Sequence, residues 1–161
     1  MTNASALEVD NGLAASDRKE LAEKLGGVLD DVYSLMVRTH VYHWNVEGPL
    51  FEPVHKLTEA QYTALFAAVD EIAERIRALD GKPAVNVNSF PTGVSNLPAA
   101  QTAASMIADL IRNHEGVVRS MRSVVAAATK ADDVVTADLL TGYIAQHEKD
   151  AWMLRSMLRG P

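Results

Sequence analysis

Apolar side chains recur every three or four residues along most of the chain, and stretches that alternate apolar with polar residues are nearly absent. The first pattern is typical of amphipathic helices, and the second would indicate strands. The pattern predicts four long helices, over residues 17–47, 51–79, 100–129 and 135–158. The chain is therefore expected to be an all-α protein.

The predicted helix ends follow from residues that cap or interrupt helices. Asp17, with Glu20 three residues later, resembles a capping box at the start of the first helix. The pair Gly48-Pro49 ends that helix, and Pro53 is tolerated because it falls in the first turn of the second. Because so few residues separate these two helices, they must form an antiparallel hairpin.

The segment 81–99 contains prolines and glycines that interrupt any long helix. It is long for a structureless loop in a compact domain, so we expect it to cross the bundle, with room for a short helix. Two long hairpins joined by a crossover favour a ferritin-like four-helix bundle over a simple up-and-down bundle. We expect one domain over residues 1–161, with residues 1–16 as a flexible N-terminal segment.

The size of the chain, 161 residues and 17.4 kDa, suits a single domain with a sizeable core. No apolar run is long enough to span a bilayer, and the N-terminal residues lack the basic start and apolar core of a signal peptide. We therefore expect a cytoplasmic protein. The absence of cysteine excludes disulfides, thiolate metal sites and cysteine nucleophiles.

The strongest chemical signal is a set of two histidines and two carboxylates, His43, His55, Asp70 and Glu74. Two imidazoles with two carboxylates suit iron or another first-row divalent metal. Asp70 and Glu74 are one helical turn apart and project to the same side of the second helix. His55 lies about 22 Å from Asp70 along that helix, so these two residues cannot share an ion within it.

The predicted hairpin places His43, near the end of the first helix, beside His55, near the start of the second. Both histidines are then far from Asp70 and Glu74. A second copy of the helix, antiparallel across a twofold axis, would bring its carboxylates opposite these histidines and create two equivalent sites per dimer. The spacing therefore predicts a metal site between two chains.

A metal centre inside one bundle is the alternative. Such a centre uses two Glu-x-x-His motifs and two further glutamates. This sequence contains one such motif, from Glu52 to His55, and no partner motif in the last predicted helix. An intrasubunit ferritin-type centre is therefore not expected.

The segment HVYHWNVEGPLFEPVHKLTEAQYTALFAAVDEIAERIRALDG resembles the signature of the Dps family, the DNA-binding proteins from starved cells, also called miniferritins. Its HWNV-x-G element, the histidine that follows and its D-x-x-AER element are together specific, and the segment covers roughly a quarter of the chain. The C-terminal EKDAWMLRSML is also similar to the family.

The resemblance implies a hollow dodecameric shell of tetrahedral symmetry, with ferroxidase centres at its twofold interfaces. It assigns His43 and His55 of one subunit, and Asp70 and Glu74 of its neighbour, as the catalytic iron ligands, with Glu59 supporting the metal site. It further implies that Fe(II) is oxidised to Fe(III), with hydrogen peroxide often preferred to oxygen, and is stored as a mineral.

Asp132, Asp133 and Asp138 lie around the start of the last predicted helix. Helix capping and the helix dipole explain acidic residues at such a position. The resemblance adds a second interpretation, in which Asp133 and Asp138 line threefold pores that admit iron. Both interpretations stay open at the level of the sequence.

Two further His-Glu pairs are contiguous in the sequence: His114, Glu115, His147 and Glu148. Neighbouring residues on a helix point about 100° apart, so neither pair forms a good chelate. We interpret both pairs as parts of solvated helix faces. Trp44 is interpreted as a packing residue, and Trp152 as a core or interface residue.

The predicted function is that of a Dps-like ferroxidase and iron store that protects against oxidative stress. Two alternatives are a nucleoid-associated DNA-binding protein with little catalytic role, and a shell that holds zinc or another divalent ion structurally. DNA binding in the family commonly depends on basic tails. This chain has a net charge of −6 and no lysine or arginine cluster at either end, so weak or no DNA binding is expected.

Overall fold

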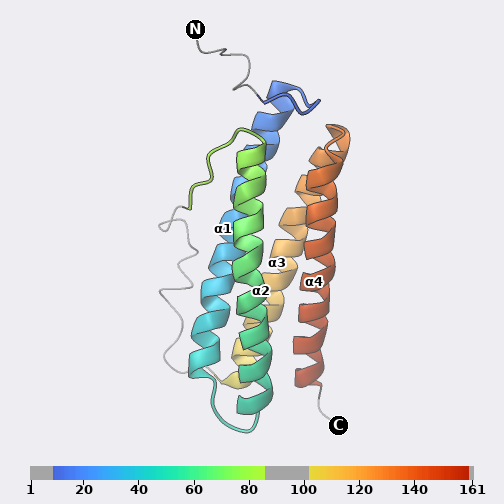
Figure 1. Ribbon diagram of the computed structural model, residues 1–161. Helices are drawn as coiled ribbons and strands as arrows, with labels where there is room; N and C mark the ends of the chain where they lie inside the picture. The colour runs from blue at the N-terminus through green and yellow to red at the C-terminus, as the bar shows by residue number, and fades with distance from the viewer. Residues whose placement is uncertain (1–8, 86–101, 160–161) are drawn as a thin grey trace.

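Figure 1 shows the computed structural model of the chain, which describes residues 9–85 and 102–159. The described part contains four helices, α1 Ala15–Asn45, α2 Phe51–Ala78, α3 Ala103–Lys130 and α4 Val134–Leu158. α1 and α2 form one antiparallel hairpin, α3 and α4 form another, and the two hairpins lie side by side in one bundle (Figure 1). The predicted all-α, ferritin-like bundle is confirmed. The expected short crossover helix falls within 81–99, of which only 81–85 are described, and these are not helical.

The core of the bundle consists of the apolar stripes that the helical periodicity identified. Side chains with no exposed surface come from all four helices, and include Leu25, Val32, Ile72, Leu110 and Leu140. Each such burial is worth about 1.5–3 kcal/mol relative to exposure, so these stripes hold the two hairpins together. None of the described helices combines the length and the apolar character that crossing a membrane requires.

The start of α1 differs from the prediction. The N-cap is Ala14, which makes no side-chain capping hydrogen bond, and Asp17 lies inside the first turn. The predicted capping box at Asp17 is therefore wrong, because the helix begins two residues earlier. Asp17 still lies close to the positive end of the helix dipole, where a carboxylate is favourable.

A tight turn joins α1 to α2. Gly48 has a φ of +87°, a left-handed backbone conformation that residues with a Cβ atom rarely adopt. The amide of Phe51 donates to the carbonyl of Gly48 at 2.9 Å and starts α2. The turn therefore places the last turn of α1 beside the first turns of α2.

The end of α2 packs closely on α1. The amide of Gly81 donates to the carbonyl of Ile76 at 2.9 Å and closes the last turn. A Cβ atom at Gly81 would lie 2.7 Å from Cβ of Ala22, a distance that real Cβ contacts essentially never show. Glycine at this position therefore lets the two helices approach each other.

Candidate metal centre

His43 and His55 lie together where α1 ends and α2 begins, as the hairpin predicted. Their rings stack with 3.8 Å between centroids and 15° between planes. His43 is buried and His55 is half-buried. The predicted proximity of the two histidines is thus present within a single chain.

The two rings are held by reciprocal hydrogen bonds. Nδ1 of His43 lies 2.9 Å from the backbone carbonyl of His55, and Nδ1 of His55 lies 2.9 Å from the carbonyl of His43. A carbonyl only accepts, so both Nδ1 atoms carry the proton when they make these bonds. Each neutral ring then has its lone pair on Nε2. A backbone carbonyl bound to the other ring nitrogen is the usual arrangement for a metal-binding histidine.

Aromatic rings border the histidine pair. Tyr62 of α2 lies edge-on to His43, with 5.2 Å between centroids, and stacks on His40 at 4.2 Å. The ring of Trp44 packs on that of His40, with 4.1 Å between centroids, although Trp44 is 63% exposed. Phe51 stacks on His55 at 5.0 Å. Contacts with Tyr62 and Phe51 therefore restrict the rotation of the His43 and His55 rings, respectively.

The predicted carboxylates lie elsewhere on α2. Asp70 and Glu74 are exposed, and neither makes a side-chain hydrogen bond or ion pair among the described residues. Glu59, one turn beyond His55, is also exposed. In the part of the chain that the structure describes, no group of three or more His, Asp or Glu side chains is placed to hold a metal ion. Within one chain the two histidines and the two carboxylates are therefore separate groups.

Asp133, one of the two predicted pore residues, is buried and caps α4. Its carboxylate accepts from the amide of Thr136 at 3.0 Å and from the guanidinium of Arg75 at 2.7 and 2.8 Å. Burial opposes the charged form, but the hydrogen bonds from Arg75 and Thr136 outweigh it and lower the pKa of Asp133. The capping interpretation of Asp133 therefore holds, whereas Asp138 is exposed.

Arg75 adjoins Glu74 in the sequence, yet it does not pair with it. Its guanidinium bridges α2 and α4, because it also donates through Nε to Oγ1 of Thr136 at 2.8 Å. This leaves the carboxylate of Glu74 free of its most obvious local partner. The sequence alone did not predict this link between the two hairpins.

His114 and His147 are buried. The prediction that they belong to solvated helix faces is therefore wrong. Their Nδ1 atoms lie 2.9 Å apart across the α3–α4 contact, so one donates to the other. Burial, together with the neighbouring His147, lowers the pKa of His114 to about 3, and burial lowers that of His147 to about 4. The neighbouring glutamates do reach the surface, where they form ion pairs: Glu115 with Arg155 and Glu148 with Arg122.

A sequence signal for this buried pair was present. Each histidine falls on the apolar stripe of its helix, between Leu110 and Val117 in α3 and between Ile144 and Ala151 in α4. A histidine that continues a buried stripe at spacings of three and four is expected to be buried itself. Trp152, by contrast, lies outside this stripe and is 61% exposed, so it is not a core residue of the chain.

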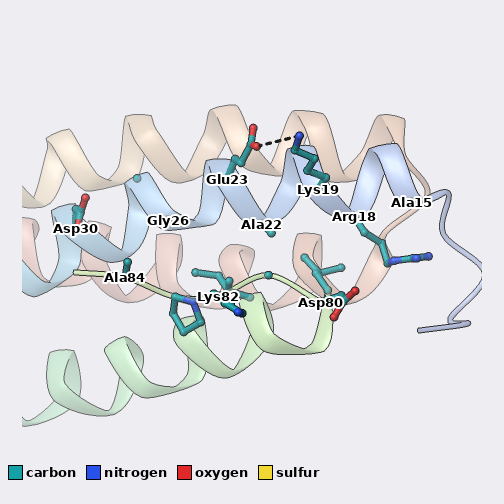
Figure 2. A pocket seen from close by; sticks show the side chains of 15 residues that line it. Ala15, Arg18, Lys19, Ala22, Glu23, Gly26, Asp30, Asp80, Lys82 and Ala84 are labelled. Atoms are coloured by element: carbon teal, nitrogen blue, oxygen red, sulfur yellow. Dashed lines mark ion pairs between the residues drawn. The ribbon is translucent and has the colours of Figure 1, made fainter. Parts of the chain in front are cut away.

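A large surface cavity lies away from the candidate centre. It has a volume of about 670 Å³ and lies between the first half of α1 and the end of α2, and none of the predicted ligands lines it (Figure 2). Its charged side chains have both signs, and Lys19 pairs with Glu23 across one turn at 4.0 Å. Its size alone therefore does not identify the functional site.

Comparison with known proteins decides the family. The ferritin-like domain family matches this chain over residues 22–160. The DNA protection during starvation protein 2 of Bacillus anthracis is 33% identical, over 87% of this chain and 97% of its own length. The chain belongs to the Dps family of ferritin-like proteins.

Other relatives of this member of the Dps family are similar to it over almost its whole length. A low temperature-induced protein of Nostoc sp. is 37% identical, over 94% of this chain and 87% of its own length. The Dps protein from Vibrio cholerae O1 has a crystal structure similar to this bundle, with a TM-score of 0.82 at 28% identity. The match covers 94% of this chain and 98% of that one, which is described as a member of the ferritin-like diiron-carboxylate proteins.

Proposed function

We propose that this protein is a ferroxidase and iron store, in which Fe(II) is oxidised at sites shared between two subunits. The observation that carries the proposal is the reciprocal hydrogen bonding of His43 and His55, which leaves both Nε2 atoms available to a metal. Membership of the Dps family and the diiron-carboxylate character of the Vibrio cholerae relative support iron as the metal.

The remaining ligands come from a second copy of the chain. Asp70 and Glu74 are exposed on α2 and too far along the helix for the histidines of their own chain. An isologous dimer of antiparallel α2 helices supplies carboxylates opposite each histidine pair, with Glu59 close by. A set of two imidazoles and two carboxylates suits Fe(II), and so few protein ligands leave open positions for the oxidant.

In the proposed reaction two Fe(II) ions each give one electron to hydrogen peroxide. The O–O bond breaks, two protons are taken up, and the products are two Fe(III) ions and two water molecules. Because both electrons reach one peroxide molecule, no hydroxyl radical is released. The Fe(III) then hydrolyses and is stored as mineral inside a dodecameric shell in the cytoplasm. Asp138, which is exposed, remains the candidate for the proposed iron entry pore, whereas Asp133 is buried and caps α4.

Protection of DNA, which the names of several relatives include, does not require DNA binding in this proposal. Removal of Fe(II) and peroxide together prevents the chemistry that damages nucleic acids. The chain carries a net charge of −6, which opposes contact with a phosphate backbone. DNA binding is therefore the second candidate function, and we expect it to be weak.

The test is the oxidation of Fe(II) in anaerobic buffer on addition of hydrogen peroxide. We expect the native protein to consume peroxide rapidly without forming hydroxyl radical, and His43→Ala/His55→Ala to lose this activity. His40→Ala serves as the matched control, because it removes an imidazole one turn away on α1 and should keep most of the rate. Equal, slow rates in all three proteins would contradict the proposed ferroxidase and favour a structural or binding shell.

A further inference from the structure

A second surface cavity lies between α3 and α4, which run side by side in the bundle (Figure 1). It has a volume of about 490 Å³, and we call it the α3–α4 cavity. Its polar side chains are Glu115, Arg119, His147, Glu148 and Arg155, and none of the predicted iron ligands lines it. Cavities of roughly 300–1,000 Å³ are typical of small-molecule sites.

His147 is the buried polar side chain of this cavity, with 3% of its surface exposed. Its Nδ1 contacts Nδ1 of His114 at 2.9 Å. Nε2 of His114 is enclosed and has no hydrogen-bond partner among the residues that the structure describes, whereas Nε2 of His147 is not enclosed in this way. Nε2 is therefore the ring nitrogen that His147 presents to the α3–α4 cavity.

The contact between the two histidines determines what this Nε2 can do. One of the two Nδ1 atoms carries a proton and the other accepts it. If His147 were the donor, the proton of His114 would lie on its enclosed Nε2, without an acceptor. Unpaired buried N–H groups are rarer than unpaired buried acceptors in protein backbones, so we expect His114 to be the donor. His147 then carries its proton on Nε2 and offers a hydrogen-bond donor to the cavity.

The charged side chains around the cavity leave one positive charge without a partner. Both glutamates are engaged by arginines, Glu115 by Arg155 and Glu148 by Arg122, the second pair at 2.7 Å. Arg119 is exposed and makes no ion pair within the described part of the chain. The cavity therefore combines an unpaired guanidinium with a buried imidazole N–H.

This combination favours an anion over a cation. No three His, Asp or Glu side chains in residues 9–85 and 102–159 are placed to hold a metal ion, and both glutamates of the cavity are already paired. A guanidinium, by contrast, binds phosphate oxygens through two parallel N–H donors. The local excess of positive charge is also distinctive, because the chain as a whole has a net charge of −6.

We propose that the α3–α4 cavity binds a phosphate group, either free phosphate or a small phosphate monoester. Arg119 supplies the two parallel donors and the charge, and Nε2 of His147 supplies the buried donor. The site needs neither iron nor the residues of the candidate metal centre, so it is independent of the proposed function.

Titration calorimetry of the iron-free, assembled protein with inorganic phosphate tests the site, at an ionic strength of about 0.15 M to screen weak surface attraction. We expect saturable binding of one phosphate per chain. Arg119→Gln should weaken it at least about tenfold, because it removes the charge and the bidentate donors. Arg112→Gln is the matched control: Arg112 is an exposed arginine of the same helix that pairs with Asp109 and does not line the cavity. It should bind phosphate like the native protein.

Two substitutions of His147 test the buried donor. His147→Gln keeps an N–H group and should retain more affinity than His147→Leu, which has none. Circular dichroism checks that both variants fold, and the exposed Arg119 carries the test if they do not. Absence of saturable binding, or equal affinity in Arg119→Gln and the native protein, would overturn the proposal.

A parallel titration with glycerol phosphate distinguishes the two sources of the phosphate group. Tighter binding of the ester than of inorganic phosphate would identify a small phosphorylated molecule as the ligand, and weaker binding would identify free phosphate. Binding of either one that depends on Arg119 supports the site, and a protein that oxidises no Fe(II) would still show it.

Discussion

The two histidine pairs of this bundle differ in what their ring nitrogens contact. In the pair His43 and His55, each Nδ1 donates to a backbone carbonyl, which frees both Nε2 atoms for a ligand. In the pair His114 and His147, the Nδ1 atoms contact each other at 2.9 Å, and Nε2 of His114 is buried with no hydrogen-bond partner among the residues that the structure describes. The first arrangement suits metal binding, and the second is a buried neutral pair that resists protonation.

The buried pair predicts acid sensitivity. Both histidines protonate near pH 6.5 in the unfolded chain, but the pKa is lowered to about 3 for His114 and about 4 for His147 in the folded one. The unfolded state therefore binds more protons below pH 6.5, so stability falls as the pH drops from about 6.5 to 4. We expect a loss of at least roughly 2 kcal/mol over this window, measured by urea unfolding at several pH values.

The control is His114→Leu/His147→Leu, which has no titrating group at this position. Its free energy of unfolding should depend much less on pH between 6.5 and 4. Asp109, which accepts hydrogen bonds from Arg38 and Tyr42, and Asp133 both have a pKa lowered below the ordinary 3.8, so these two groups affect stability at lower pH than this window. An equally steep pH dependence in both proteins would show that other groups cause the acid sensitivity.

At the scale of helices, one ion pair connects the end of α2 with the start of α4. Arg75 and Asp133 are 12% and 2% exposed, and Thr136 completes the contact with hydrogen bonds to both. Asp133 is at the same time the N-cap of α4. Because Glu74 adjoins Arg75, this contact also holds the part of α2 that presents a proposed iron ligand.

Arg75→Ala should destabilise the bundle by about 3 kcal/mol, because it leaves the carboxylate of Asp133 buried without its cation. Arg122→Ala is the matched control. It removes an arginine from an ion pair with Glu148 in which both side chains are more than half exposed, and should cost about 0.5 kcal/mol. Chemical unfolding monitored by circular dichroism measures both values, and equal losses would contradict the structural role of the buried pair.

At the scale of the whole molecule, the histidine pair and the two exposed carboxylates of α2 lie at different levels along the bundle axis. In the proposed function, each subunit gives its histidines to one centre and its carboxylates to another. Loss of either set of ligands in one subunit would therefore disable one of the two centres of a dimer and leave the other centre intact.

Complementation between two inactive variants tests this arrangement. His43→Ala/His55→Ala keeps the carboxylates and Asp70→Ala/Glu74→Ala keeps the histidines, so a mixed dimer contains one complete centre. Random assembly of equal amounts should restore about a quarter of the native rate of peroxide-dependent Fe(II) oxidation. Each variant alone is the control. Co-assembled shells with no activity would contradict centres that are shared between chains.

Sequence by itself determined the helical elements of this protein and singled out its candidate metal ligands. Apolar spacing set the four helices, the short Gly48-Pro49 connection set the first hairpin, and the spacing of His55 and Asp70 excluded a centre within one helix. These are local properties, because helical periodicity and rise convert sequence separation directly into direction and distance. The segment 86–101 lies outside the described residues, so its predicted crossing is untested.

Only the tertiary structure decided which polar groups meet. Asp133 contacts Arg75 across 58 residues and His114 contacts His147 across 33, and such pairings depend on how the two hairpins pack. The proton positions on His43 and His55 likewise follow from backbone carbonyls that only the folded hairpin supplies. Sequence spacing thus identified the candidate ligands, and packing of the hairpins determined the hydrogen bonds that orient the two histidines.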